Sequence, residues 1–191
     1  MRDKLAAMPD VIVIGDGPGG LSAALFLAKA GKQVVVFGQD KTAMHWALLR
    51  NYLGIAEIHG SELQTIGRAQ VTGFGGTLRD ERIDSVALEH GTFTVITEGG
   101  ESIAAKYLVL SEGKSPKLAT MLGLRFDPET GVAADRNGRT EVDGAYVVGR
   151  LARPGRSQAI ISAGDGAAVA IDILSREKGE SVTDWDSPPE S

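Results

Sequence analysis

Three glycines near the beginning of the chain, Gly15, Gly17 and Gly20, have the spacing G-x-G-x-x-G. At this spacing the first glycine permits a sharp turn out of a strand, and the second leaves room for a diphosphate to approach the backbone. The third lets a helix pack closely on the strand. Pro18 and Gly19 lie between them, where a helix begins and where its free N–H groups attract anions. The chemistry indicated is therefore the binding of a dinucleotide.

The elements that must position this turn follow from the apolar residues around it. The β-branched run 10–14 predicts a buried parallel strand, 22–30 predicts a helix, and 34–37 predicts a second strand. Together they make a βαβ unit of about 30 residues, the length that the glycine fingerprint requires. An acidic side chain that binds an adenosine ribose is expected about 20 residues after the glycines. Asp40, with Gln39 beside it, lies near that position, and a solvated loop acid is the alternative.

Farther along the chain the apolar pattern changes its period. A short amphipathic segment is predicted over 41–54, and a helix over 62–70 with Ser61 as its N-cap. Short alternating runs separated by glycine turns then predict an antiparallel meander, after which continuous apolar runs return to the parallel sheet. The meander covers 83–89, 91–97 and 102–105, the sheet strands cover 107–110 and 145–148, a short helical segment covers 117–122, and a long final helix covers 158–175.

The composition is that of an ordinary globular protein. The chain has 191 residues and a formal net charge of −5, which argues against nucleic acid as a partner. Its apolar runs fall short of the ~20 residues of a membrane span, and residues 1–8 show no signal-peptide pattern. We therefore expect no membrane association and a cytoplasmic location. We predict a single domain over 1–179 and a disordered polar tail over 180–191.

The residue types present exclude several kinds of site. The chain has no cysteine, so it carries no disulfide, thiolate metal ligand, cysteine nucleophile or C-x-x-C dithiol of its own. His45, His59 and His90 lack metal-ligand spacing, and we expect them at the surface or at an interface. We predict no metal site and no catalytic side chain, since Glu112 and Asp165 have no evident partner for acid–base chemistry.

Four later segments, taken in order with the glycine turn, show a joint pattern. They are Asn-Tyr-Leu-Gly at 51–54, the run ending in Ser-Glu-Gly at 107–113, the segment 140–149, and Ser-Gln-Ala with its glycine-rich continuation at 157–168. Together the five segments resemble the FAD half of the thioredoxin reductase-like flavoproteins, among the FAD-dependent pyridine nucleotide-disulfide oxidoreductases. The resemblance implies an α/β fold, a Rossmann-like FAD-binding domain with a central parallel sheet, helices and an inserted antiparallel β-meander. It also implies that the closing helix directs its N-terminal N–H groups at the flavin.

The resemblance carries a cofactor site onto the matching positions of this chain. Trp46 and Tyr52 either stack on a flavin or fill the core or a subunit interface. The residues expected to bind FAD are Gly15, Gly17, Pro18, Gly19, Gly20, Gln39, Asp40, Asn51, Gly113, Gly149, Arg150, Ser157, Gln158 and Ala159.

Four departures from the family pattern limit what the resemblance implies. The family's nicotinamide-binding domain is inserted where this chain runs straight on through 116–123, and its redox cysteine pair has no counterpart here. Its second flavin motif has Gly-Asp, whose carboxylate accepts hydrogen bonds from the ribityl chain, whereas this chain has Gly149 and Arg150, a donor only. Bulkier residues at 42–46 replace a Gly-Gly pair. We therefore expect weakened FAD binding.

Three functions remain open from the sequence. The first is a minimal FAD-binding oxidoreductase without dithiol chemistry, using diffusible NAD(P)H or an electron-carrier protein, with a partner or a small-molecule oxidant as acceptor. The second is a non-catalytic nucleotide-binding or regulatory relative, in which Arg150 is a surface residue or binds a phosphate together with Arg153 or Arg156. The third is an NAD(P)-binding Rossmann protein, against which the segment 149–168 argues. Because family members commonly dimerise through the FAD domain, a homodimer is expected.

Overall fold

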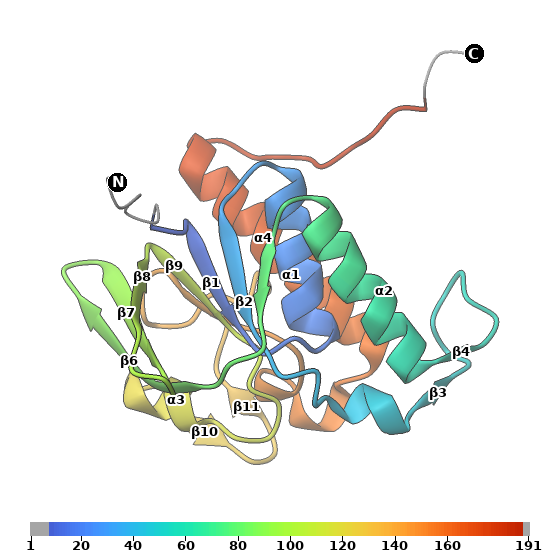
Figure 1. The fold of residues 1–191 in the computed structure, drawn as a ribbon, viewed down its shortest axis with the longest axis horizontal. Helices are drawn as coiled ribbons and strands as arrows, with labels where there is room; N and C mark the ends of the chain where they lie inside the picture. The colour runs from blue at the N-terminus through green and yellow to red at the C-terminus, as the bar shows by residue number, and fades with distance from the viewer. Residues whose placement is uncertain (1–7, 189–191) are drawn as a thin grey trace.

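The computed structural model of the protein describes residues 8–188, and its centre is a five-stranded parallel sheet (Figure 1). The strand order is β12-β9-β1-β2-β5, so the first strand lies in the middle of the sheet. Val11 pairs with Val34 on one side and with Tyr107 on the other. The strands are β1 (Val11–Ile14), β2 (Val34–Phe37), β5 (Thr77–Arg79), β9 (Tyr107–Leu110) and β12 (Ala145–Val147).

Three helices cover one face of this sheet, as the arrangement in Figure 1 shows. They are α1 (Pro18–Lys29), α2 (Gly60–Gly73) and α4 (Ala159–Lys178). Leu27 of α1 and Ile173 of α4 are fully buried against the sheet, and burial of such side chains stabilises the fold by about 1.5–3 kcal/mol each.

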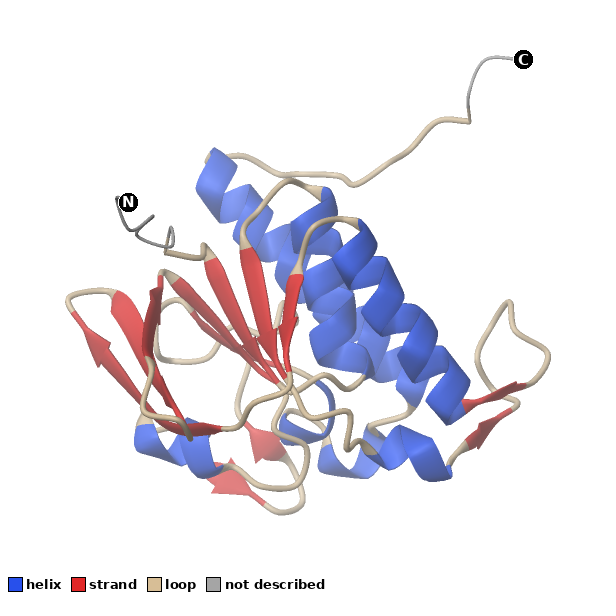
Figure 2. Ribbon diagram, in the orientation of Figure 1, coloured by secondary structure: helices blue, strands red, loops and turns tan. Residues whose placement is uncertain are grey.

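The opposite face is covered by the meander and by short elements that follow it (Figure 2). Phe93 and Val95 of the meander are fully buried and belong to the same apolar cluster as Leu108 and Leu110 of β9. Both faces of the parallel sheet are therefore buried, which explains why its strands are continuous apolar runs. The elements on this side are β6 (Ile83–Glu89), β7 (Thr92–Thr97), β8 (Ser102–Ala105), α3 (Lys117–Met121), β10 (Phe126–Asp127) and β11 (Gly131–Val132).

This architecture confirms the predicted Rossmann-like α/β class with an inserted antiparallel meander. The βαβ unit, the meander and the two later sheet strands lie within a few residues of their predicted bounds. Helix α1 begins at Pro18 rather than at 22, since proline is well suited to the first helical turn. Helix α4 continues to Lys178 and ends where Gly179 adopts a left-handed conformation.

One local prediction was wrong, and two local features were not predicted. The segment 41–54, predicted only as amphipathic, contains a 3-10 turn (Ala43–Trp46) and β3 (Leu48–Leu49), which pairs with β4 (Ile58–His59). The helix predicted over 62–70 runs from Gly60 to Gly73, and its N-cap is the ring of His59, whose Nδ1 accepts a hydrogen bond from the N–H of Ser61. Strand β5 was not predicted.

The end of the chain follows α4 without regular secondary structure over 181–188, and residues 189–191 of the predicted tail lie outside the described part. Val182 packs against the helical face of the core, and Lys29 forms an ion pair of 2.7 Å with Asp184. The division into one domain and a tail stays a prediction. Within 8–188 no helix combines the length and the apolarity that crossing a membrane requires.

Candidate nucleotide-binding site

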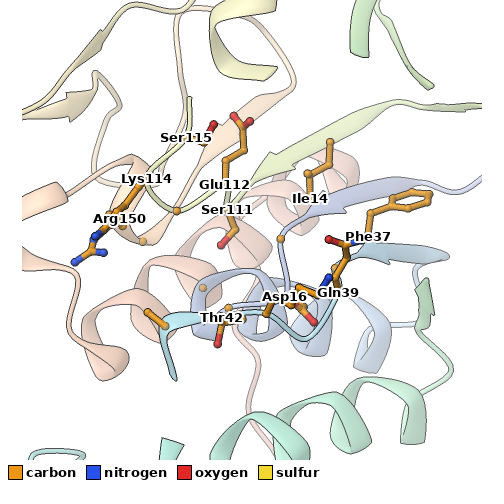
Figure 3. Close-up of a pocket in the computed structure, with 18 of the residues that line it drawn as sticks. Ile14, Asp16, Phe37, Gln39, Thr42, Ser111, Glu112, Lys114, Ser115 and Arg150 are labelled. Atoms are coloured by element: carbon orange, nitrogen blue, oxygen red, sulfur yellow. The ribbon is translucent and has the colours of Figure 1, made fainter. Parts of the chain in front are cut away.

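A cleft of about 730 Å³ opens along the carboxyl ends of the central strands, where open α/β sheets bind their ligands (Figure 3). The glycine turn forms part of its wall, and the segments that follow β2, β5, β9 and β12 form the rest. Its lining residues are Ile14, Gly15, Asp16, Gly17, Pro18, Gly19, Phe37, Gly38, Gln39, Lys41, Thr42, Ala43, Met44, Glu81, Arg82, Ile83, Ser111, Glu112, Gly113, Lys114, Ser115, Lys117, Leu118, Gly149, Arg150, Ser157, Ala159 and Ser162.

The glycine turn has the geometry that its spacing predicts. Gly15 has a φ of +100°, and a side chain on it would strike the carbonyl of Ser111. A side chain on Gly20 would strike the carbonyl of Gly15, so this glycine permits the close approach of α1 to β1. Gly17 differs from both, because the nearest atom to a Cβ at that position would be Oγ of Ser111, at 4.0 Å. The surface over Gly17 is therefore open to a ligand.

Two helix N-termini face this cleft. Gly17 is the N-cap of α1 and Gln158 is the N-cap of α4, and neither cap makes a side-chain hydrogen bond to the helix. Pro18 and Ala159, the first residues of the two helices, line the cleft. The positive ends of both helix dipoles thus favour a ligand that carries negative charge.

Basic side chains outnumber acidic ones along the cleft. Lys41, Lys114 and Arg150 make no ion pair within residues 8–188, and Figure 3 shows Lys114 and Arg150 extending toward the same end of the cleft. Lys117 and Arg82 also line the cleft, and each lies within 3.7 Å of the Asp84 carboxylate. The unpaired cations suit a phosphate-containing ligand.

Glu112 is an acid in the cleft wall that serves a structural purpose. Its two carboxylate oxygens accept the N–H groups of Leu118 (2.8 Å) and Ala119 (2.9 Å) at the start of α3. Burial raises the pKa of Glu112, and these two hydrogen bonds together with Lys117 act against that rise. The carboxylate therefore holds the loop after β9 onto α3, which had not been predicted.

Most of the predicted site residues meet in the cleft, and four do not. Those lining it are Gly15, Gly17, Pro18, Gly19, Gln39, Gly113, Gly149, Arg150, Ser157 and Ala159. Gly20 lies behind the turn against Gly15. The amide of Asn51 donates to Oε1 of Gln158 at 3.2 Å, so these two contact each other outside the lining. Asp40 also lies outside it.

Asp40 lies against His45 rather than in the cleft lining. Nε2 of His45 lies 3.1 Å from Oδ1 of Asp40 and 2.6 Å from its carbonyl oxygen. The carboxylate at this edge of the cleft is instead that of Asp16, which lies next to the first glycine and is 3% exposed. Position 16 is a variable position of the G-x-G-x-x-G motif, so the motif does not predict a role for it. The only signal in the sequence is that the residue there is acidic.

The remaining candidate residues, two aromatic and two basic, lie outside the cleft lining. Trp46 is 91% exposed and lines no part of the cleft, whereas Tyr52 packs against a small apolar cluster that includes Ala159. Arg153 pairs with Asp165 at 3.1 Å, and neither Arg153 nor Arg156 joins Arg150 in the cleft. Among the described residues no cluster of histidine and acidic side chains could hold a metal ion.

Comparison with known proteins agrees with this geometry. A family described as FAD binding domain matches residues 10–48. The bifunctional thioredoxin reductase/thioredoxin of Mycobacterium leprae (strain TN) is 32% identical over 173 residues, covering 87% of this chain and 35% of that protein. The thioredoxin reductase of Mycolicibacterium smegmatis is 37% identical over 114 residues, covering 56% of this chain and 36% of that protein. The chain is thus similar in sequence to part of the thioredoxin reductases, and its first βαβ unit matches an FAD binding domain.

Solved structures of thioredoxin reductases share the fold. A thioredoxin reductase from Gloeobacter violaceus matches with a TM-score of 0.84 at 18% identity, covering 94% of this chain and 99% of that chain. The atypical thioredoxin reductase TRi from Desulfovibrio vulgaris Hildenborough matches with a TM-score of 0.80 at 20% identity, covering 91% and 99%. By sequence, the chain spans about a third of the length of the curated relatives it matches.

The residues of the cleft fit FAD over most of its length. The open surface at Gly17 and the bare N-terminus of α1 fit a diphosphate, and the volume lies in the range of cofactor pockets. The fit changes at Arg150, where the family motif has an acceptor and this chain has a guanidinium that can only donate. At that point the cleft suits a phosphate oxygen better than a ribityl hydroxyl.

Proposed function

We propose that this chain binds FAD and acts as a minimal oxidoreductase that exchanges electrons with molecules outside the chain. The observation that carries the proposal is that two helix N-termini without side-chain caps, at Gly17 and at Gln158, face the same cleft. A dinucleotide with a central diphosphate and a second electron-rich end matches two such positive regions. The open backbone at Gly17 provides the close approach that a diphosphate needs.

The protein's own groups would bind and orient this cofactor. The N–H groups at the start of α1 would hold the diphosphate, with positive charge added by Arg150 and Lys114. Ser157 and Ala159, at the start of α4, would present N–H groups to the flavin end. FAD, when bound, supplies the two-electron chemistry, and the chain contributes binding, orientation and partial exclusion of water.

Two features of the chain bear on its electron donor and its electron acceptor. Because the chain has no cysteine, its acceptor is not a dithiol of its own. Residues 117–123 form α3 and its C-terminal turn at the position where the family inserts its nicotinamide-binding domain. These two features support a diffusible NAD(P)H or an electron-carrier protein as donor, and a partner protein or a small-molecule oxidant as acceptor.

A non-catalytic nucleotide-binding or regulatory role is the second candidate. It is favoured by Arg150 and by the side chains of Thr42 and Met44, which line the cleft where the family has a Gly-Gly pair. A chain that binds an adenine nucleotide without orienting a flavin would fit these two departures.

An absorption spectrum of the purified protein separates the two candidates. We expect flavin bands in the protein as purified or after addition of FAD, and loss of the band near 450 nm on anaerobic addition of NAD(P)H or a reduced carrier. A thermal-shift series with FAD, FMN, NAD, NADP and ATP should show its largest stabilisation with FAD. A protein that stays colourless with FAD and is stabilised by ATP alone would instead establish the second candidate.

We further propose that two copies associate and that the protein acts in the cytoplasm. Trp46 and Leu53 are 91% and 88% exposed beside the β3–β4 ribbon, and large apolar side chains of this kind are commonly covered in an interface. Light scattering should give the mass of a dimer, and Trp46→Gln should shift it toward the monomer. Cell fractionation tests the location.

A further inference from the structure

The end of β2 lacks the acidic side chain that dinucleotide-binding folds use to bind a ribose. In such folds a carboxylate there accepts a hydrogen bond from the 2′-hydroxyl of the adenosine ribose. In this chain β2 is followed by Gly38 and Gln39, and neither carries a carboxylate. Asp40 comes next, but its backbone has a φ of +51° and its carboxylate lies against His45, outside the cleft. Another residue must therefore supply the carboxylate that would bind the ribose.

Asp16 brings a carboxylate to this place from the neighbouring strand. It follows Gly15 at the end of β1, and Figure 3 shows its side chain in the cleft wall near Gln39 and Thr42. Its Oδ2 accepts the N–H of Asp40 at 3.0 Å, which ties the carboxylate to the segment after β2. Asp16 therefore occupies the expected region of a ribose-binding acid although it lies on the glycine turn.

Gly38 makes room for this arrangement. A Cβ at position 38 would lie 2.6 Å from Oδ1 of Asp16, which is far inside the contact distance of carbon and oxygen. An acidic residue at 38 and an aspartate at 16 thus exclude each other. In this chain the carboxylate is at position 16 and position 38 is a glycine.

Only one of the two carboxylate oxygens of Asp16 accepts hydrogen bonds from described residues. Oδ2 of Asp16 also accepts from Nη1 of Arg68, whose Nη2 donates to Asp80 at 2.5 Å. The guanidinium offsets the free-energy cost of burying the carboxylate. Within residues 8–188 no group donates to Oδ1 of Asp16, although this residue lines the cleft. One oxygen therefore holds the side chain in place, and the other has no donor among the described residues.

We infer that Asp16 recognises the 2′-hydroxyl of the ligand's adenosine ribose and selects against nucleotides that carry a 2′-phosphate. The inference rests on the proposed nucleotide-binding function and names the residue that would read the ribose. Oδ1 accepts from the hydroxyl as a charge-assisted bond, whereas the negative charge of a 2′-phosphate would meet the negative charge of Asp16.

The test compares nucleotides that differ only at the 2′ position, by calorimetric titration of the full chain. The probes are ADP, 2′-deoxy-ADP and ADP carrying a 2′-phosphate. The wild-type protein should bind ADP at least about 10-fold more tightly than either analogue, the difference expected for a hydrogen bond to a charged group. Asp16→Ala should reduce the preference over 2′-deoxy-ADP to below about 3-fold. Asp16→Asn should restore part of it while admitting the 2′-phosphate.

Asp80→Asn is the matched control. It removes the other carboxylate that Arg68 binds, and Asp80 is outside the cleft with a side chain that is 69% exposed. If Asp16 served only to hold Arg68, both variants would weaken all three nucleotides equally. We expect Asp80→Asn to keep the wild-type preference.

Three results would overturn the inference. They are a wild-type protein that does not distinguish ADP from 2′-deoxy-ADP, an Asp16→Ala variant that retains the full preference, and loss of the preference in Asp40→Asn instead. A wild-type protein that binds neither ADP nor FAD would overturn the proposed function as well, so the two failures are distinguishable. The wild-type comparison stands without any variant, should Asp16→Ala fail to fold.

Discussion

The α-carbon of Gly38 lies against the carboxyl group of Asp16, so closely that no side chain fits between them. Gly38 directly follows β2 and Asp16 lies two residues after β1, so both lie where these adjacent parallel strands end. The contact fixes the carboxylate at the wall of the cleft. The position of the Asp16 carboxylate also requires a glycine at position 38.

Gly38→Ala should therefore destabilise the protein through Asp16. The added methyl group would displace the carboxylate from Arg68 and from the N–H of Asp40, at a cost of about 1–3 kcal/mol in the free energy of unfolding. Urea denaturation measures this cost. In an Asp16→Ala background the same substitution should cost much less, since the clashing group is gone. Gly73→Ala, where a Cβ meets nothing within 4 Å, is the control.

Gly17→Ala should affect binding without affecting folding. Gly17 has a φ of −69°, which any residue can adopt, and its surroundings leave room for a methyl group. That methyl group would stand where the diphosphate approaches the backbone, so FAD should bind about 10-fold more weakly or worse. Fluorescence titration gives the affinity and thermal melting gives the stability. Gly164→Ala is the control on α4, and equal FAD affinity in both variants would contradict the prediction.

Arg150→Asp should weaken FAD binding, because it replaces a cation in the cleft by an anion and FAD carries negative charge on its diphosphate. The loss should be steeper at low ionic strength, where screening is weakest. Arg156→Asp makes the same change of charge in the same loop but outside the cleft, and it should have little effect. If Arg150→Asp instead raised the affinity, Arg150 would be the residue that has weakened a flavin site, in favour of the non-catalytic candidate.

Glu177→Gln should destabilise the protein in a pH-dependent manner. Lys106 and the hydroxyl of Tyr107 hydrogen-bond Glu177 at 2.5 and 2.8 Å and lower its pKa from 4.5 to about 2, with Lys32 adding to the effect. Because the folded-state pKa is lowered, the carboxylate stabilises the folded protein above pH 4.5, and this contribution is lost as the pH falls toward 2.

The melting temperatures of wild type and Glu177→Gln should therefore differ at pH 7 and converge at low pH. Glu180→Gln is the control, since the Glu180 side chain is 65% exposed beside Lys178 and should change the melting temperature little. A difference for Glu177→Gln that stays constant from pH 7 to pH 3 would contradict the assigned pKa.

Much of the fold was predictable because its strongest patterns are local. The strands β1 and β9 are continuous apolar runs because both faces of the sheet are covered, and the meander alternates because one face meets water. Strand β5, with the sequence Thr-Leu-Arg, carries no such pattern. It is a strand because it pairs with β2, and pairing between distant segments leaves little trace in three residues.

The candidate site was predictable only in its backbone. The glycine turn and the start of α4 are local patterns, since glycine positions and helix beginnings are encoded within a few residues. Asp40 is expected in the site because its distance along the chain suits a ribose ligand, whereas in the structure it lies outside the cleft lining with its side chain against His45. Sequence spacing fixes how far a residue is from the turn but not where its side chain points.

The sequence by itself thus determined the class of fold, the glycine turn and the exclusion of cysteine chemistry on this chain. Only the tertiary structure decided which charged side chains reach the cleft. Asp16, Gly38 and Arg68 come from the end of β1, the end of β2 and α2, and they meet only when those elements are packed. A glycine's freedom belongs to the residue itself, whereas the role of a charge depends on the groups that packing brings against it.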